Sequence, residues 1–168
     1  PVSGIVLFAK TSKALTRLNE MLREREIKKT YWAITKNRPA KPEMLLEHYL
    51  LRNEKQNKSY AYDTPKGDAK KATLTIKELA TSTNYTLLEV DLQTGRHHQI
   101  RCQLAHIGCP IKGDLKYGFA RSNPDGGISL HARQINFIHP VTKEPIEIIA
   151  PTPEDNLWKA FEDMIRNA

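Results

Sequence analysis

The densest cluster of chemically active side chains in this sequence lies in residues 94–101, which read TGRHHQIR. The segment directly follows a run of strand-forming residues, and Gly95 predicts a tight turn from a strand into a helix. The first turn of a helix presents free backbone N–H groups and positive potential, and Arg96 adds a cation beside them. We therefore expect this segment to contact an anionic group such as a phosphate.

Arg101 is expected at the edge of the buried face of this helix. The pattern predicts a helix over residues 97–107, with Ile100 toward the core and His97 on the same face as Arg101. A partly buried arginine needs a carboxylate or phosphate partner. Two interpretations stay open: a structural salt bridge, or an arginine that orients an active-site carboxylate while Arg96 and the histidines contact an RNA backbone.

The histidines and cysteines in and after this segment raise two further chemistries. The candidate metal ligands are His97, His98, Cys102, His106 and Cys109. Their spacing lacks the paired Cys-x-x-Cys modules of zinc sites, so we expect no metal site. Adjacent histidines on a helix point about 100° apart. This geometry argues against a nuclease in which the two act as general acid and base on one phosphodiester.

Tyr31 lies in a β-branched and aromatic run, residues 29–35, which predicts a strand. Alternation places Tyr31 and Ala33 on one face of that strand and Trp32 and Ile34 on the other. A strand tyrosine usually packs in the core with its hydroxyl hydrogen-bonded. The alternative is a platform that stacks on a base extracted from RNA and offers its phenol as a proton acceptor.

The hydrophobic pattern around these residues predicts seven strands and three helices. The expected strands are residues 4–10, 29–35, 44–51, 73–79, 85–92, 128–138 and 145–149. The expected helices follow Thr11 or Ser12, span residues 97–107, and follow Pro153 and Glu154. The polar residues 55–71 form a surface hairpin or a mobile loop in this interpretation. Strands linked mainly by hairpins indicate an α+β fold with a mixed, mostly antiparallel sheet and flanking helices.

Composition indicates one globular domain over residues 1–168. The chain has 168 residues, 39% of them hydrophobic and 27% charged, which suits a single core in a soluble protein. No apolar run is long enough to cross a bilayer, and two cysteines are too few for a secreted disulfide scaffold. We expect a cytoplasmic monomer. Because Pro1 is followed so soon by an apolar run, we also expect the chain to begin within the domain.

The charge distribution favours a polyanion-binding protein. The net charge is +7, with nine Lys/Arg against three Asp/Glu in residues 1–38 and three against six in residues 141–168. This asymmetry indicates a positive face and an acidic end. The alternative is that the cations around residues 23–29 only form the solvated end of a helix.

Six segments together resemble the RluA family of RNA pseudouridine synthases. They read SGIVLFAKT (residues 3–11), KTYWA (29–33), TGRHHQIR (94–101), GCPIKGD (108–114), LHA (130–132) and HP (139–140). Their order and approximate spacing agree with the family over nearly the whole chain. The GRxHQIR pattern is the most specific of them.

The resemblance implies an isomerase without a cofactor. Such an enzyme flips a uridine out of structured ribosomal or transfer RNA, cleaves its C1′–N1 bond, rotates the uracil and rejoins it through C5. The family's nucleophile is the aspartate of the pattern H-R-L-D-R-x-T-S-G. Ser3 and Gly4 match the end of that pattern and Val2 replaces its threonine, so the aspartate falls two residues before Pro1. We therefore expect residues 1–168 alone to be inactive.

The resemblance also implies roles for individual residues. Tyr31 matches the tyrosine that stacks on the uracil, Arg101 the basic residue that pairs with the aspartate, and Leu130 the apolar residue lining the uracil pocket. The residues expected to contact RNA are Arg96, His97, His98, Gln99, Lys10 and Lys29. Gln103 departs from the family, where many members carry histidine. The segment LHA also fits the ordinary core of a strand. The alternative function is an RNA-binding module of the same fold that has lost catalysis.

Overall fold

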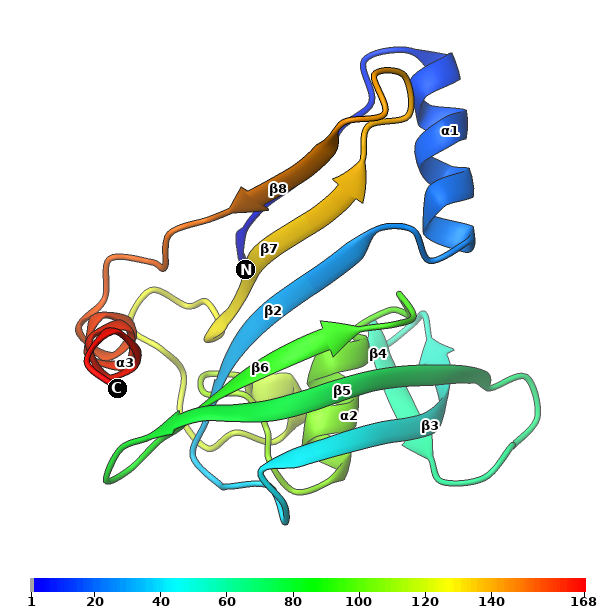
Figure 1. The fold of residues 1–168 in the computed structure, drawn as a ribbon. Coiled ribbons are helices and arrows are strands. Elements are labelled where there is room, and N and C mark those ends of the chain that lie inside the picture. The colour runs from blue at the N-terminus through cyan, green and yellow to red at the C-terminus, as the bar shows by residue number, and fades with distance from the viewer. Residues whose placement is uncertain (1) are drawn as a thin grey trace.

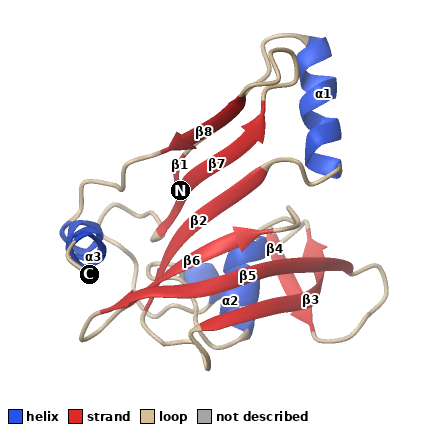
Figure 2. Cartoon of the chain, in the orientation of Figure 1, coloured by secondary structure: helices blue, strands red, loops and turns tan. Residues whose placement is uncertain are grey.

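The computed structural model describes residues 2–168, which form one eight-stranded sheet with flanking helices (Figures 1 and 2). The strands are β1 (Ser3–Gly4), β2 (Lys28–Thr35), β3 (Glu43–Asn53), β4 (Lys58–Tyr62), β5 (Lys70–Thr81), β6 (Thr86–Leu92), β7 (Leu130–Ile138) and β8 (Pro145–Ile149). The helices are α1 (Ser12–Arg23), α2 (Gln99–His106), the short 3-10 helix η1 (Leu115–Tyr117) and α3 (Asn156–Arg166). No helix of residues 2–168 is both long and apolar enough to span a membrane.

The sheet is mixed and mostly antiparallel. Its order is β1-β7-β2-β6-β5-β3-β4, and β8 also pairs with β7. β1 runs parallel to β7, whereas the other strand pairs of the described chain are antiparallel. The α+β class expected from the hairpin pattern is therefore confirmed.

The two faces of the sheet are covered by different helices. Ile100 and Leu104 of α2 lie in the main core with Ala33 of β2, and Tyr31 packs against the same cluster. On the opposite face, the side chains Trp32, Ile34, Leu87, Trp158 and Phe161 form a second cluster between the sheet and α3. The alternation expected for residues 31–34 is confirmed, and it places Tyr31 on the α2 face.

The segment expected to form a buried strand, residues 4–10, is mostly exposed loop. Only Ser3 and Gly4 pair with β7, and the Ile5 N–H still donates to the Ala132 carbonyl at 3.1 Å. Val6 and Phe8 are 71% and 82% exposed. The physical reason is competition for one strand edge. From Gln134 onward β8 pairs with the edge of β7 that β1 uses, so the apolar run has no sheet neighbour beyond Ile5.

The short strand β1 is fixed to β7 by a buried histidine. His131 is 2% exposed, and its Nε2 lies 3.1 Å from the Ala150 carbonyl, to which it donates. Its Nδ1 then accepts a hydrogen bond from the Ser3 hydroxyl at 2.8 Å. Burial lowers the pKa of His131, so the neutral ring that this arrangement needs is the stable form near pH 7. The LHA segment thus positions the start of the chain.

Gly4 has no room for a side chain, which gives a testable prediction. Its φ is +118°, and a Cβ there would lie 2.3 Å from the Ala132 carbonyl oxygen. We expect Gly4→Ala to lower the free energy of unfolding by roughly 2–4 kcal/mol, because strain and a backbone clash add. Urea denaturation measures the change. Gly95→Ala is the matched control, since no atom lies within 4 Å of its Cβ position. Equal stability of both variants would contradict the close β1–β7 contact.

The polar residues 55–71 contain a strand that the sequence pattern did not predict. β4 pairs with β3, which precedes this region, from Tyr49–Tyr62 to Asn53–Lys58, and residues 63–69 connect β4 to β5 without pairing the two strands. The Cys102 thiol of α2 lies 3.4 Å from the Ser59 carbonyl of β4. The β3–β4 hairpin therefore forms one wall beside α2.

Candidate functional site

The turn into α2 differs from the expected one. The helix begins at Gln99, two residues later than expected, and His98 precedes it with φ 51° and ψ 29° in the left-handed region. Gly95 is not among the residues with positive φ in the described chain, so the strained position is the histidine. His97 therefore lies outside the helix and does not share a helical face with Arg101. A left-handed non-glycine residue costs free energy and is often found at functional sites.

Gln99 holds this turn together from inside. It is 3% exposed, and its Oε1 accepts hydrogen bonds from the Thr94 hydroxyl at 2.7 Å and the Arg96 N–H at 3.0 Å. Its Nε2 donates to the Thr73 carbonyl at 3.1 Å. The RNA contact expected of Gln99 is therefore not available in this arrangement. Its amide fixes the loop that carries Arg96 and His97.

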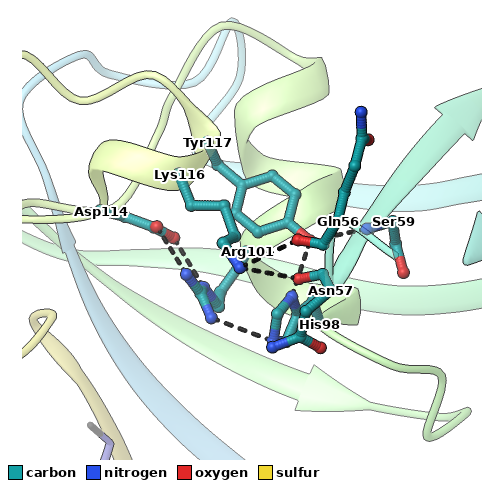
Figure 3. A network of polar contacts seen from close by, with 8 residues as sticks. All are labelled: Gln56, Asn57, Ser59, His98, Arg101, Asp114, Lys116 and Tyr117. Carbon is teal, nitrogen blue, oxygen red and sulfur yellow. Dashed lines mark hydrogen bonds and ion pairs between the residues drawn. The ribbon is translucent and has the colours of Figure 1, made fainter. Parts of the chain in front are cut away.

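Arg101 has an internal carboxylate partner, Asp114 (Figure 3). Its Nε and Nη2 donate to the two oxygens of Asp114, each at 2.8 Å. Asp114 is 1% exposed and the Arg101 side chain 19%. The hydrogen bonds to Asp114 raise the pKa of Arg101 despite its burial. The structural salt bridge is thus present. The sequence interpretation did not predict Asp114 as a site residue, although Asp114 lies in the segment GCPIKGD.

Arg101 also orients His98. The Nη1 of Arg101 lies 3.1 Å from His98 Nε2 and donates to it, so His98 carries its proton on Nδ1. That Nδ1–H donates to the Tyr117 hydroxyl at 2.8 Å, and the hydroxyl also accepts the Ser59 N–H at 2.9 Å. Burial, followed by the charge of Arg101, lowers the pKa of His98 to about 4. His98 is therefore a neutral, fixed ring near pH 7.

His97 lies at the surface of this network. Its ring stacks on His98 with 3.8 Å between ring centroids, and its Nδ1 is 2.8 Å from the Ser59 hydroxyl. Burial lowers the pKa of His97, and the charges of Arg52, Arg101 and Lys116 lower it further. So many cations around one neutral ring create positive potential, which suits a phosphate group.

The sequence interpretation did not predict several of these network residues as part of the site. They are Asn57, Ser59, Asp114, Lys116 and Tyr117. The Lys116 ammonium donates to the Asn57 carbonyl at 2.9 Å, which ties η1 to the β3–β4 turn (Figure 3). Only the GD of GCPIKGD was a usable signal, because the other residues come from a hairpin and a 3-10 helix without a periodic pattern.

Tyr31 lines a separate cavity of about 320 Å³ on the same face of the sheet as α2. Lys29 and Ala132 also line this cavity. Burial raises the pKa of Tyr31, so its phenol is protonated near pH 7. Leu130 is 5% exposed and lies in the core cluster against which Tyr31 packs. The structure therefore brings Tyr31, Leu130 and the apolar side of α2 together.

The remaining residues expected to contact RNA lie in different places. Arg96 is exposed and shares a surface pocket with His97, Arg52 and Lys70. Its Nε donates to the Lys71 carbonyl at 2.9 Å, which holds the side chain across β5. Lys10 is exposed before α1 and lines neither this pocket nor the Tyr31 cavity.

Comparison with known proteins gives a consistent result. A family model described as RNA pseudouridylate synthase matches residues 1–106. Ribosomal large subunit pseudouridine synthase C of Buchnera aphidicola is 35% identical over 173 residues, covering 98% of this chain and 53% of that protein. tRNA pseudouridine synthase C of Vibrio parahaemolyticus is 29% identical over 177 residues, covering 95% and 70%.

A solved structure shares the fold. The human protein RNA pseudouridylate synthase domain containing 4 superposes with a TM-score of 0.72 at 21% identity, over 93% of this chain and 69% of that one. This chain spans about half the length of the first curated relatives it matches.

Proposed function

Because the chain belongs to the RNA pseudouridylate synthase family, we propose that it forms most of the catalytic domain of an enzyme that isomerises uridine to pseudouridine in ribosomal or transfer RNA. The observation that carries the proposal is the placement of Tyr31. This tyrosine lines a cavity whose other wall comes from α1, and it also packs against the buried core that holds Leu130 and Ile100 of α2. A flipped uracil needs such a slot, with an aromatic face for stacking and apolar walls.

The nucleophile of the proposed reaction is an aspartate upstream of Pro1. The support is the family pattern that Ser3 and Gly4 complete, together with the position of these two residues. Ser3 pairs in parallel with His131, so the chain preceding β1 approaches the start of β7, where Leu130 lies. In our proposal an upstream aspartate would then approach from the Leu130 end of β7. Residues 1–168 without it are expected to be inactive.

Arg101 has hydrogen-bonding capacity left for that aspartate. A guanidinium has five N–H donors, and the described residues accept three of them: two by Asp114 and one by His98. The remaining donors, one on each terminal nitrogen, can bind a second carboxylate. A cation beside a desolvated aspartate keeps it ionised, as a nucleophile must be. Asp114 in this proposal is the anchor that holds Arg101 ready.

The raised pKa of Tyr31 refines its proposed role. A protonated phenol stacks on uracil as well as a phenolate does, but it accepts a proton only if it passes its own on. In our proposal Tyr31 therefore takes the C5 proton as a relay and releases its hydroxyl proton to a water molecule, because no described residue accepts a hydrogen bond from it. Its ring holds the base while the glycosidic bond re-forms.

Arg96 and His97 are the proposed phosphate contacts. We expect Arg96→Ala in the full-length protein to weaken RNA binding and to reduce the slope of log K against log salt by about 0.7–0.9, the loss of one phosphate contact. Binding titrations at several salt concentrations measure this slope. Arg166→Ala, on the acidic end of the chain and 72% exposed, is the control. Equal slopes for Arg96→Ala and the unmodified protein would remove Arg96 from the RNA interface.

The competing function is an RNA-binding module of the same fold without catalysis. The basic network around His97 would serve either function, so it does not separate them. The residue encoded two positions before Pro1 does: an aspartate favours the enzyme and a non-acidic residue favours the binder. Release of tritium from RNA labelled at uridine C5 tests the activity itself.

A further inference from the structure

A second cluster of titratable side chains lies at the C-terminal end of α2, outside the proposed reaction. It consists of His48 of β3, Asp63 directly after β4 and His106, the last residue of α2. His48 is buried, whereas Asp63 and His106 are exposed. One potential ligand atom from each residue lies within 4.8 Å of the other two. The proposed isomerisation uses none of these groups.

The distances in this cluster are close to those of a metal centre. His106 Nε2 lies 2.8 Å and His48 Nε2 3.7 Å from Asp63 Oδ1. Ligands about 2.0–2.2 Å from a tetrahedral Zn²⁺ lie about 3.4 Å from one another. The measured separations fall on either side of that value. The Asp63 side chain is 79% exposed and the His106 side chain 30%, so both have freedom to close on a metal while His48 stays fixed.

We propose that His48, Asp63 and His106 form a binding site for a divalent transition metal, best suited to Zn²⁺. Two imidazoles and one carboxylate are a ligand set that zinc favours, with a water molecule in the fourth position. Hard cations such as Mg²⁺ and Ca²⁺ require more oxygen ligands than this cluster offers. The metal would link the β3–β4 hairpin to the end of α2.

Gln103 provides the second observation for this site. It is fully buried, its Nε2 lies 2.8 Å from His48 Nδ1, and its Oε1 has no hydrogen-bond partner among the described residues. In this arrangement Gln103 donates to Nδ1, so the proton of neutral His48 is on Nε2. A metal at Nε2 needs that proton moved to Nδ1 and an acceptor beside it.

A half-turn of the Gln103 amide supplies that acceptor. Its Oε1 would then accept the Nδ1–H of His48, and the buried oxygen would gain the partner it lacks. His48 loses one proton at Nε2 and gains one at Nδ1, so the ring stays neutral. The turn also brings Oε1 against the Leu46 and Ala72 carbonyls, which Nε2 now contacts at 3.4 and 3.3 Å, and it leaves Nε2 where Oε1 has no partner. Zinc binding therefore has to outweigh the cost of these altered contacts.

Metal titration of the untagged chain, after removal of metals with EDTA, tests this proposal. With Zn²⁺ at about one hundred times its dissociation constant, we expect one bound ion per chain and a melting temperature raised by about 5–10 °C. Co²⁺ in place of Zn²⁺ should give visible absorption bands of a four-coordinate ion. Asp63→Asn and His106→Ala alter exposed side chains, so both variants should fold, and each should bind Zn²⁺ at least tenfold more weakly.

Asp68→Asn is the matched control, because Asp68 is an exposed carboxylate in the same connection between β4 and β5 as Asp63. It should bind Zn²⁺ as the unmodified chain does. No saturable binding by the unmodified chain would overturn the proposal and leave an ion pair between His106 and Asp63. Binding of equal strength by all variants would overturn it too, by placing the metal elsewhere. The readouts do not depend on RNA or on activity, so failure here leaves the proposed function untouched.

Discussion

Asp114→Ala is expected to lower the free energy of unfolding by about 3–5 kcal/mol, since it leaves a largely buried guanidinium without its carboxylate. The two hydrogen bonds of 2.8 Å hold Arg101 against a residue that is 1% exposed. Without Asp114, the charge of Arg101 has no carboxylate partner and stays next to Tyr117, whose ring centroid lies 5.0 Å from the Arg101 guanidinium carbon. Urea denaturation followed by circular dichroism measures the loss.

Two controls separate this effect from a general loss of charge. Asp163→Ala removes a carboxylate from the exposed ion pair with Arg166, and it should change stability by less than about 1 kcal/mol. The double variant Arg101→Met with Asp114→Leu should be more stable than Asp114→Ala, because no unpaired charge remains. An Asp114→Ala protein as stable as the Asp163→Ala protein would show that the buried pair contributes nothing.

Tyr31→Phe in the full-length protein is expected to lower kcat by about 10²–10⁴, the usual contribution of a group that transfers a proton. KM should change little, because phenylalanine keeps the ring that stacks on the base. Stability should also change little, since the Tyr31 hydroxyl makes no hydrogen bond with any other residue of the described chain. Steady-state tritium release at several RNA concentrations separates the two constants.

Tyr49→Phe is the matched control for this experiment. Tyr49 is also half-buried in a strand, but it lies in β3 and does not line the Tyr31 cavity. Its substitution should leave both constants unchanged. A Tyr31→Phe enzyme with full kcat would remove the phenol from the chemistry and leave Tyr31 only a stacking role.

Local sequence patterns predicted the parts of the fold that depend on neighbouring residues. The alternation from Tyr31 to Ile34 gave both faces of β2, because each face packs on a different helix. The strand at residues 145–149 has the expected bounds. The prediction of a strand at residues 4–10 was wrong. Whether this apolar run pairs with β7 depends on β8, which follows it by more than a hundred residues and pairs with the same edge of β7.

The site was predictable only in part for the same reason. The polar cluster at residues 94–101 forms the loop before α2 and the start of that helix, and the partly buried Arg101 has the carboxylate partner that its burial requires. Which carboxylate it meets depends on the turn that brings Asp114 back against α2, thirteen residues later. The sequence pattern placed the tight turn at Gly95, whereas the left-handed residue is His98, which hydrogen bonds from Arg101 and to Tyr117 hold in place.

We propose that this chain is part of an enzyme that isomerises uridine and whose aspartate lies upstream of Pro1. The most direct test is tritium release from ribosomal and transfer RNA labelled at uridine C5, catalysed by the full-length protein. We expect release by the full-length protein and none by residues 1–168 alone or by the full-length protein with its upstream aspartate changed to asparagine. RNA that is bound by the full-length protein without releasing tritium, although that aspartate is present, would contradict the proposed isomerase activity.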